Sequence, residues 1–190
     1  MAEVCFDPEL PDYVQELCGG QTGGMPFLGF VKSDVAIDFD NLAATVENAS
    51  WWTGGVAGSP SSMFVALNTR GSKPKGTPTE QPGFGFNSVV RSGVDRTAEF
   101  EALGPVENEA FWSGVNRKTS MTFIYGTTTK NADGDYIAYI AKNASINADV
   151  VIDEDIKSLL RIGGDAKWST DGTLDKSFIF PASVIESLSA

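Results

Sequence analysis

Histidine is absent from this 190-residue chain. The chain therefore lacks the commonest general base, the usual partner of a serine or cysteine nucleophile, and the commonest metal ligand. This absence argues against most enzyme classes. We expect a protein that is not an enzyme, with no catalytic residues, no bound cofactor and no metal. Chemistry based on carboxylates or lysine stays open. A carboxylate-dependent hydrolase is therefore one functional alternative, ranked below the two that are described later in this section.

Cysteine is also scarce, with Cys5 and Cys18 as its two occurrences. Their spacing is too wide for a redox pair, and two thiols without histidine cannot complete a four-ligand zinc site. No apolar run reaches the ~20 residues that a membrane helix needs. The acidic N-terminus lacks the basic-then-apolar pattern of a signal peptide. We therefore expect a protein that folds in a cytosol without disulfides and has no membrane partner.

Basic residues are few, and the net charge is −11. Residues 1–69 hold nine acids and a single base, Lys32, and the tightest basic cluster is Arg70, Lys73 and Lys75. A surface this negative repels nucleic acid and argues against a dedicated DNA or RNA binder. The charge is compatible with DNA that passes nearby without specific binding.

Turn signals at short intervals separate seven to eight predicted strands, a pattern typical of a β-sandwich or barrel. Strands are predicted at 27–39, 63–67, 86–103, 121–128, 136–142, 146–153, 159–169 and 176–180. Apolar residues at helical spacing predict helices at 40–53 and 106–117. The expected fold class is mainly β, an antiparallel sandwich or barrel with one or two flanking helices and extended arms.

The expected domain covers residues 27–181. Residues 1–26 read as an N-terminal arm, in which the glycine-rich stretch 19–24 is a flexible hinge. Residues 182–190 read as a short C-terminal tail. Trp51 and Trp52 are candidates for the core or for an interface, and we expect one of them in the core.

Residues 68–85 are predicted to form one long loop, because they contain three prolines, four glycines and three bases. A loop this long within a compact domain is uncommon and is usually functional or disordered. One interpretation is a mobile solvent loop. The other is a protruding arm that orders against a neighbouring subunit, where its positive charge meets an acidic body. The second interpretation makes Arg70, Lys73, Lys75 and Phe84 the candidate subunit interface.

Two further patterns are candidate binding sites. Asn131, Asp133 and Asp135 resemble the start of a calcium loop, but the glycine falls at the fourth position instead of the sixth. An Asp-Gly hairpin turn explains the same residues better. Exposed Trp51, Trp52 or Trp112 would stack on sugar rings, so a carbohydrate- or receptor-binding β-sandwich is the second functional alternative.

The order of the elements resembles the tail-tube (major tail protein) family of long-tailed bacteriophages. The resemblance is one of layout and spans roughly residues 27–181. Its parts are an arm loop at 70–85, a flanking helix at 107–117, and late strand pairs at 121–128 with 136–142 and 146–153 with 159–169. The N-terminal arm and the helix at 41–53 depart from the simplest tube pattern. They leave room for a head–tail joining or capsid accessory protein.

The resemblance implies a virion structural protein, assembled in a bacterial cytoplasm, whose partners are its own copies and other virion proteins. Tail-tube subunits form stacked rings around a channel for DNA. Acids on the sheet that faces this lumen would repel phosphate, and Asp149 and Asp153 are the lumen-facing candidates. Acids that simply keep the free subunit soluble are the alternative explanation.

Overall fold

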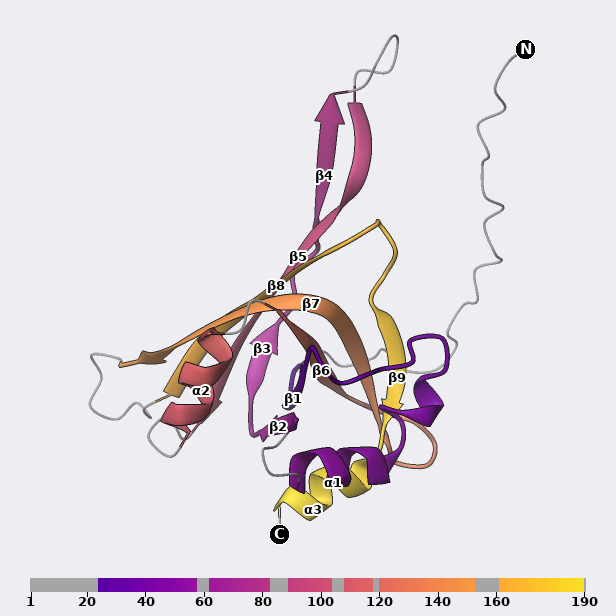
Figure 1. Cartoon of the computed structure of the whole chain (residues 1–190), viewed down its shortest axis with the longest axis vertical. Coiled ribbons are helices and arrows are strands. Elements are labelled where there is room, and N and C mark those ends of the chain that lie inside the picture. The colour runs from indigo at the N-terminus through magenta and orange to yellow at the C-terminus, as the bar shows by residue number, and fades with distance from the viewer. Residues whose placement is uncertain are drawn as a thin grey trace.

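The computed structural model of the chain describes residues 24–57, 62–82, 89–103, 108–117, 120–152 and 161–189. Within these ranges the chain is mainly β, which confirms the expected fold class (Figure 1). The strands are β1 (Phe27–Lys32), β2 (Met63–Leu67), β3 (Arg70–Ser72), β4 (Thr77–Pro82), β5 (Val89–Leu103), β6 (Met121–Lys130), β7 (Tyr136–Val151), β8 (Arg161–Thr170) and β9 (Lys176–Phe180). The helices are the short 3-10 helix η1 (Leu42–Ala44), α1 (Ala49–Ala57), α2 (Glu109–Asn116) and α3 (Ala182–Ser189).

The long, curved strand β7 joins two layers of antiparallel strands (Figure 1). Its first part, 136–144, pairs with β6 and β9, and its second part, 145–151, pairs with β8. The first layer therefore contains β2, β1, β6 and β9, and the second contains β8, β5, β3 and β4. Asn143, with φ +52°, sits where β7 passes from one layer to the other. Asparagine tolerates this left-handed conformation better than most residues.

Aromatic side chains fill the core between the two layers. Phe30 on β1 and Phe123 on β6 are fully buried, and they face Phe100 on β5. Trp112 on α2 packs edge-on against Phe30, with ring centroids 5.7 Å apart. The side of α2 that contacts the core carries the buried Trp112 and Val115.

The first layer is also covered on its outer face, by α1 and α3. Trp52 on α1 is fully buried, and its indole N–H donates to the carbonyl oxygen of Val46 at 2.8 Å. Trp52 is therefore the tryptophan of the pair that belongs to the core, while Trp51 is half-buried. Because both faces of this layer are covered, β1 is buried continuously from Phe27 to Val31. The second layer buries one face only.

The predicted loop at 68–85 is wrong over two stretches. Residues 70–72 form β3 and residues 77–82 form β4, and both pair with β5. Pro78 and Pro82 are tolerated because β4 is an edge strand, where a missing backbone N–H need not break a ladder. The segment also contributes to the interior, because Thr69 is buried and donates its hydroxyl to the carbonyl of Met25 at 2.7 Å.

Two predicted boundaries near the chain ends also change. The tail predicted at 182–190 contains a helix, α3, whose Val184 is buried against the first layer. The helix predicted at 40–53 is divided into η1 and α1, although Leu42 and Val46 are buried as its pattern predicted. Of the predicted N-terminal arm, residues 1–23 lie outside the described ranges.

Gly126 on β6 provides a test of the packing. A Cβ at this position would lie 2.1 Å from Cε1 of Phe27. We expect Gly126→Ala to lower the free energy of unfolding by about 1–3 kcal/mol, because the core must shift to admit the methyl group. Gly114→Ala on α2, where a Cβ meets nothing within 4 Å, should instead raise it by about 0.5–1 kcal/mol. Urea unfolding measures both, and equal losses at the two positions would contradict this packing.

Candidate functional site

The most distinctive feature of the surface is a β-hairpin that projects from the body (Figure 1). It consists of β4 and the first part of β5. β5 pairs with β8 only from Val94 onward, where Val94 lies opposite Thr170. From the pair Thr79–Gly93 outward, β4 and β5 therefore pair only with each other in the described part of the chain. None of the residues 77–81 is buried. The projecting part therefore adds little to the subunit's own core.

A buried carboxylate, Asp175, holds the base of this hairpin. Its side chain is 3% exposed. It accepts hydrogen bonds from the hydroxyl of Tyr125 at 2.6 Å and from the indole N–H of Trp168 at 2.9 Å. It also pairs with the ammonium group of Lys73 at 3.2 Å and with the guanidinium of Arg96 at 3.6 Å. We call these five side chains the Asp175 clamp.

The clamp connects parts of the chain that are distant in sequence. Lys73 lies in the connection between β3 and β4, Tyr125 on β6, Arg96 on β5 and Trp168 on β8. Because Lys73 lies in the segment that leads from β3 into β4, its ion pair ties the start of the hairpin to both layers. A buried carboxylate that accepts two hydrogen bonds and faces two cations favours one geometry over others.

The clamp is built for structure rather than for proton transfer. Burial is the main cause that raises the pKa of Tyr125 above its ordinary value, and the hydrogen bond to Asp175 adds to it. The phenol therefore stays protonated and donates to Asp175 throughout the ordinary pH range. Arg96 is held further by a 2.8 Å hydrogen bond to the carbonyl of Thr173.

The candidate interface residues lie near the base of the hairpin and not at its end. Arg70 on β3 pairs with Glu101 of β5, and Lys73 pairs with Asp175. Arg70 and Lys73 therefore each have an acidic partner within their own chain, and the expected attraction to a neighbour's acids stays a prediction. Lys75 is exposed, and Phe84 lies outside the described residues. An interface role for all four stays a prediction.

The outer face of the second layer is polar. Asp149 on β7, Gly163 on β8, Glu101 on β5 and Arg70 on β3 form one row across it. The charged side chains that share this face are Arg70, Asp95, Glu99, Glu101, Asp149, Arg161, Asp165 and Lys167. Five of these eight are acids. We call this surface the polar outer face; it includes Asp149, and Asp153 lies outside the described residues.

A titration tests the geometry of this face. The hydrogen bond from Arg70 is the main cause that lowers the pKa of Glu101 from its ordinary value, and the charge of Arg161 contributes further. Because the folded-state pKa is depressed, the stabilisation is present above the unfolded value and is lost as pH falls through the folded value. We expect Arg70→Ala to raise the pKa of Glu101 in a carboxyl NMR titration. Lys167→Ala, which removes the partner of Asp165, should leave Glu101 unchanged.

The other candidate binding residues, in the 131–135 turn and among the tryptophans, have structural roles. Asn131 Oδ1 accepts hydrogen bonds from the backbone N–H groups of Asp133 and Asp135, both at 2.9 Å, and Gly134 has φ +89°. These contacts build the predicted hairpin turn. Trp52 and Trp112 are buried, so neither is placed to stack on a sugar. In the described ranges, no group of three or more histidine, cysteine or acidic side chains is placed to hold a metal ion.

The clamp was missed by sequence reasoning. Asp175 follows the Asp171-Gly172 turn and looks like one more solvated acid. No short spacing relates it to Lys73 or Arg96. The one available signal was the proximity of Trp168 to this turn, since a buried indole N–H needs an acceptor.

Comparisons with known proteins do not assign a function to this chain, so the geometry of its structure is the basis for the functional argument. No protein-family model and no curated protein matches this sequence. In the part of the chain that the structure describes, no helix has the length and apolar character needed to span a bilayer. The functional argument therefore depends on the hairpin, the clamp and the polar outer face.

Proposed function

We propose that this chain is a virion structural protein whose copies assemble through the projecting hairpin, and that it serves as a tail-tube subunit in stacked rings around a DNA channel. The observation that carries the proposal is the hairpin itself. Its strands extend beyond the body, its described side chains are not buried, and a buried ion cluster fixes its base. Such an element gains contacts only when another molecule provides them.

The clamp supports a binding role for the hairpin. Ordering a flexible loop on binding costs conformational free energy, which lowers affinity. A hairpin already paired along β4 and β5 and anchored through Lys73 has lost most of that freedom before contact. Repeated contacts between a hairpin and a different patch on the next copy are heterologous, and such contacts close into rings or continue as filaments.

The polar outer face supports the proposal that the subunits line a DNA channel. It is a sheet surface without an apolar cover in the described part of the chain, and acids outnumber bases on it. Lining a channel with such faces would repel phosphate and let DNA pass without sticking. Asp149 is the lumen-facing candidate with a described side chain, and it is exposed.

Electron microscopy of the purified full-length chain tests the proposal. We expect rings or tubes in negative stain, and sedimentation coefficients that rise with protein concentration. Single rings that never stack would favour the head–tail joining alternative over the tube. A strictly monomeric protein at all concentrations and salt conditions would overturn the proposal.

A further inference from the structure

The turn between β8 and β9 presents an exposed leucine. Leu174 is 84% exposed, the highest value among the large apolar side chains of the described ranges. Single exposed apolar residues are ordinary on protein surfaces, so exposure alone marks no binding site. Leu174 differs from an ordinary surface leucine because the residues on both sides of it are held in place.

Hydrogen bonds and ion pairs fix the turn around Leu174. Asp171 Oδ1 accepts hydrogen bonds from the backbone N–H and the hydroxyl of Thr173, at 3.2 and 2.7 Å. The carbonyl of Thr173 in turn accepts a hydrogen bond from the guanidinium of Arg96 at 2.8 Å. On the other side of Leu174, Asp175 is the centre of the clamp. The turn therefore presents an apolar side chain together with the carboxylate of Asp171, and a group that is already ordered loses little freedom on binding.

A cavity of about 330 Å³ between α2 and the first layer has the size and character to receive such a side chain. We call it the α2 cavity. α2 forms one wall, and Phe64 of β2 and Met121 of β6 form part of the other. Gly114 keeps the cavity open on the helix side, because even a Cβ at this position would meet nothing within 4 Å. Lys32, at the end of β1, is the one charged residue among the described residues that line it.

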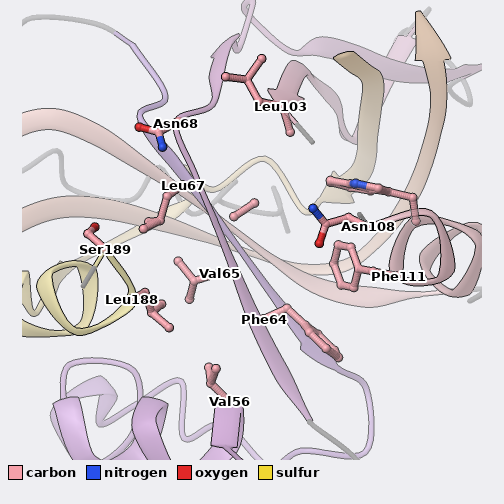
Figure 2. Close-up of a pocket in the computed structure, with 13 residues that line it drawn as sticks. Val56, Phe64, Val65, Leu67, Asn68, Leu103, Asn108, Phe111, Leu188 and Ser189 are labelled. Carbon is pink, nitrogen blue, oxygen red and sulfur yellow. The ribbon is translucent and has the colours of Figure 1, made fainter. Parts of the chain in front are cut away.

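Lys32 makes the α2 cavity a match for a negative partner. It is the single base among residues 1–69, and within the described ranges its ammonium group has no acidic partner. Its Nζ lies 5.9 Å from the ring centroid of Phe64. A second cavity, of about 540 Å³, shares Phe64 and Phe111 with the first (Figure 2), but none of its described lining residues is charged. Charge therefore favours the cavity beside Lys32 as the place for an apolar group that arrives with a carboxylate.

We propose that Leu174 of one copy docks in the α2 cavity of the next copy, with Asp171 beside Lys32. The inference rests on the proposed self-assembly and adds a contact separate from the hairpin. α2 and the connection between β8 and β9 lie on opposite sides of the body in Figure 1. A contact between two different surfaces of one chain is heterologous, so it repeats from copy to copy and closes a ring when the rotation permits.

Sedimentation velocity on variants of the full-length chain tests this contact. Leu174→Asp places a charge where the apolar side chain would dock, and Ile152→Asp is the matched control, because Ile152 is 80% exposed. Gly114→Phe fills the α2 cavity, and Ser113→Phe is its control, because Ser113 is an exposed neighbour on α2 that does not line the cavity. Circular dichroism checks that each variant is folded. The double variant, Leu174→Asp with Gly114→Phe, is measured as well.

We expect Leu174→Asp and Gly114→Phe each to raise the concentration needed for assembly about 30-fold, the effect of losing one buried leucine from a contact, and both controls to leave it within about twofold. The double variant should show about the same 30-fold rise, because both changes remove one shared contact. Rises that multiply to roughly 1,000-fold would overturn the inference, as would equal effects of the variants and their controls. Assembly of the unmodified chain that both variants leave unchanged refutes this contact alone, whereas an unmodified chain that never assembles refutes the proposed function as well.

Discussion

Replacing Asp175 with asparagine is expected to lower the free energy of unfolding by about 3–5 kcal/mol. Asparagine keeps the size of the side chain and one acceptor oxygen, so Tyr125 or Trp168 retains a partner. It removes the negative charge that compensates Arg96, which is 7% exposed, and Lys73. A buried cation without its counter-charge carries a large desolvation cost.

Urea unfolding followed by tryptophan fluorescence measures this loss. Asp133→Asn is the matched control, because it removes the same charge from an exposed turn. We expect the control to leave the unfolding midpoint nearly unchanged. If Asp175→Asn and Asp133→Asn unfold at the same urea concentration, the clamp does not hold the base of the hairpin.

Shortening the hairpin is expected to abolish assembly and leave a folded subunit. In the proposed variant, residues 80–92 are replaced by Asn-Gly, which joins Thr79 to Gly93 through a two-residue turn suited to antiparallel strands. The pairs that anchor β4 to β5 near the body, from Thr77 to Thr79, are kept. Lys73 and the rest of the Asp175 clamp are also retained.

Sedimentation velocity measures the effect. We expect the concentration needed for assembly to rise on the order of 100-fold or more, since the contacts removed would include the strongest ones of the interface. Circular dichroism and urea unfolding should match the unmodified chain, because the described residues removed are not buried. Assembly of the shortened chain at the original concentration would show that the hairpin is not the contact.

Much of the fold could be predicted from the sequence, because half-buried strands carry a two-residue period. The alternation from Ile146 to Ile152 placed Asp149 on a polar face, and Asp149 is exposed while Ile146 and Ala148 are buried. The same alternation was wrong for Val150 and Ile152, which are exposed. The Asp-Gly turn at 133–134 was likewise predicted from its residues. β4 gave no such signal, because an edge strand that buries no side chain has no apolar period to detect.

The candidate site was harder to predict. The clamp depends on side chains from three strands and two connecting segments that meet only after the two layers pack. The charges of Arg70 and Lys73 looked available to a neighbour because their partners, Glu101 and Asp175, are distant in sequence. The sequence predicts a tail where α3 forms, since its eight residues have no acid in the first turn and no base in the last turn, and so give little local evidence of a helix.

Amide hydrogen exchange along β4 tests the central claim most directly, because it reports whether the hairpin is held by another copy. The measurement compares residues 77–81 in assembled material and in the dispersed subunit, with β6 as an internal reference. We predict that the β4 amides exchange at least about tenfold more slowly in the assembly, while the β6 amides exchange alike in both. Equal exchange along β4 in the two samples would mean that the hairpin stays in solvent, and the assembly proposal would be wrong.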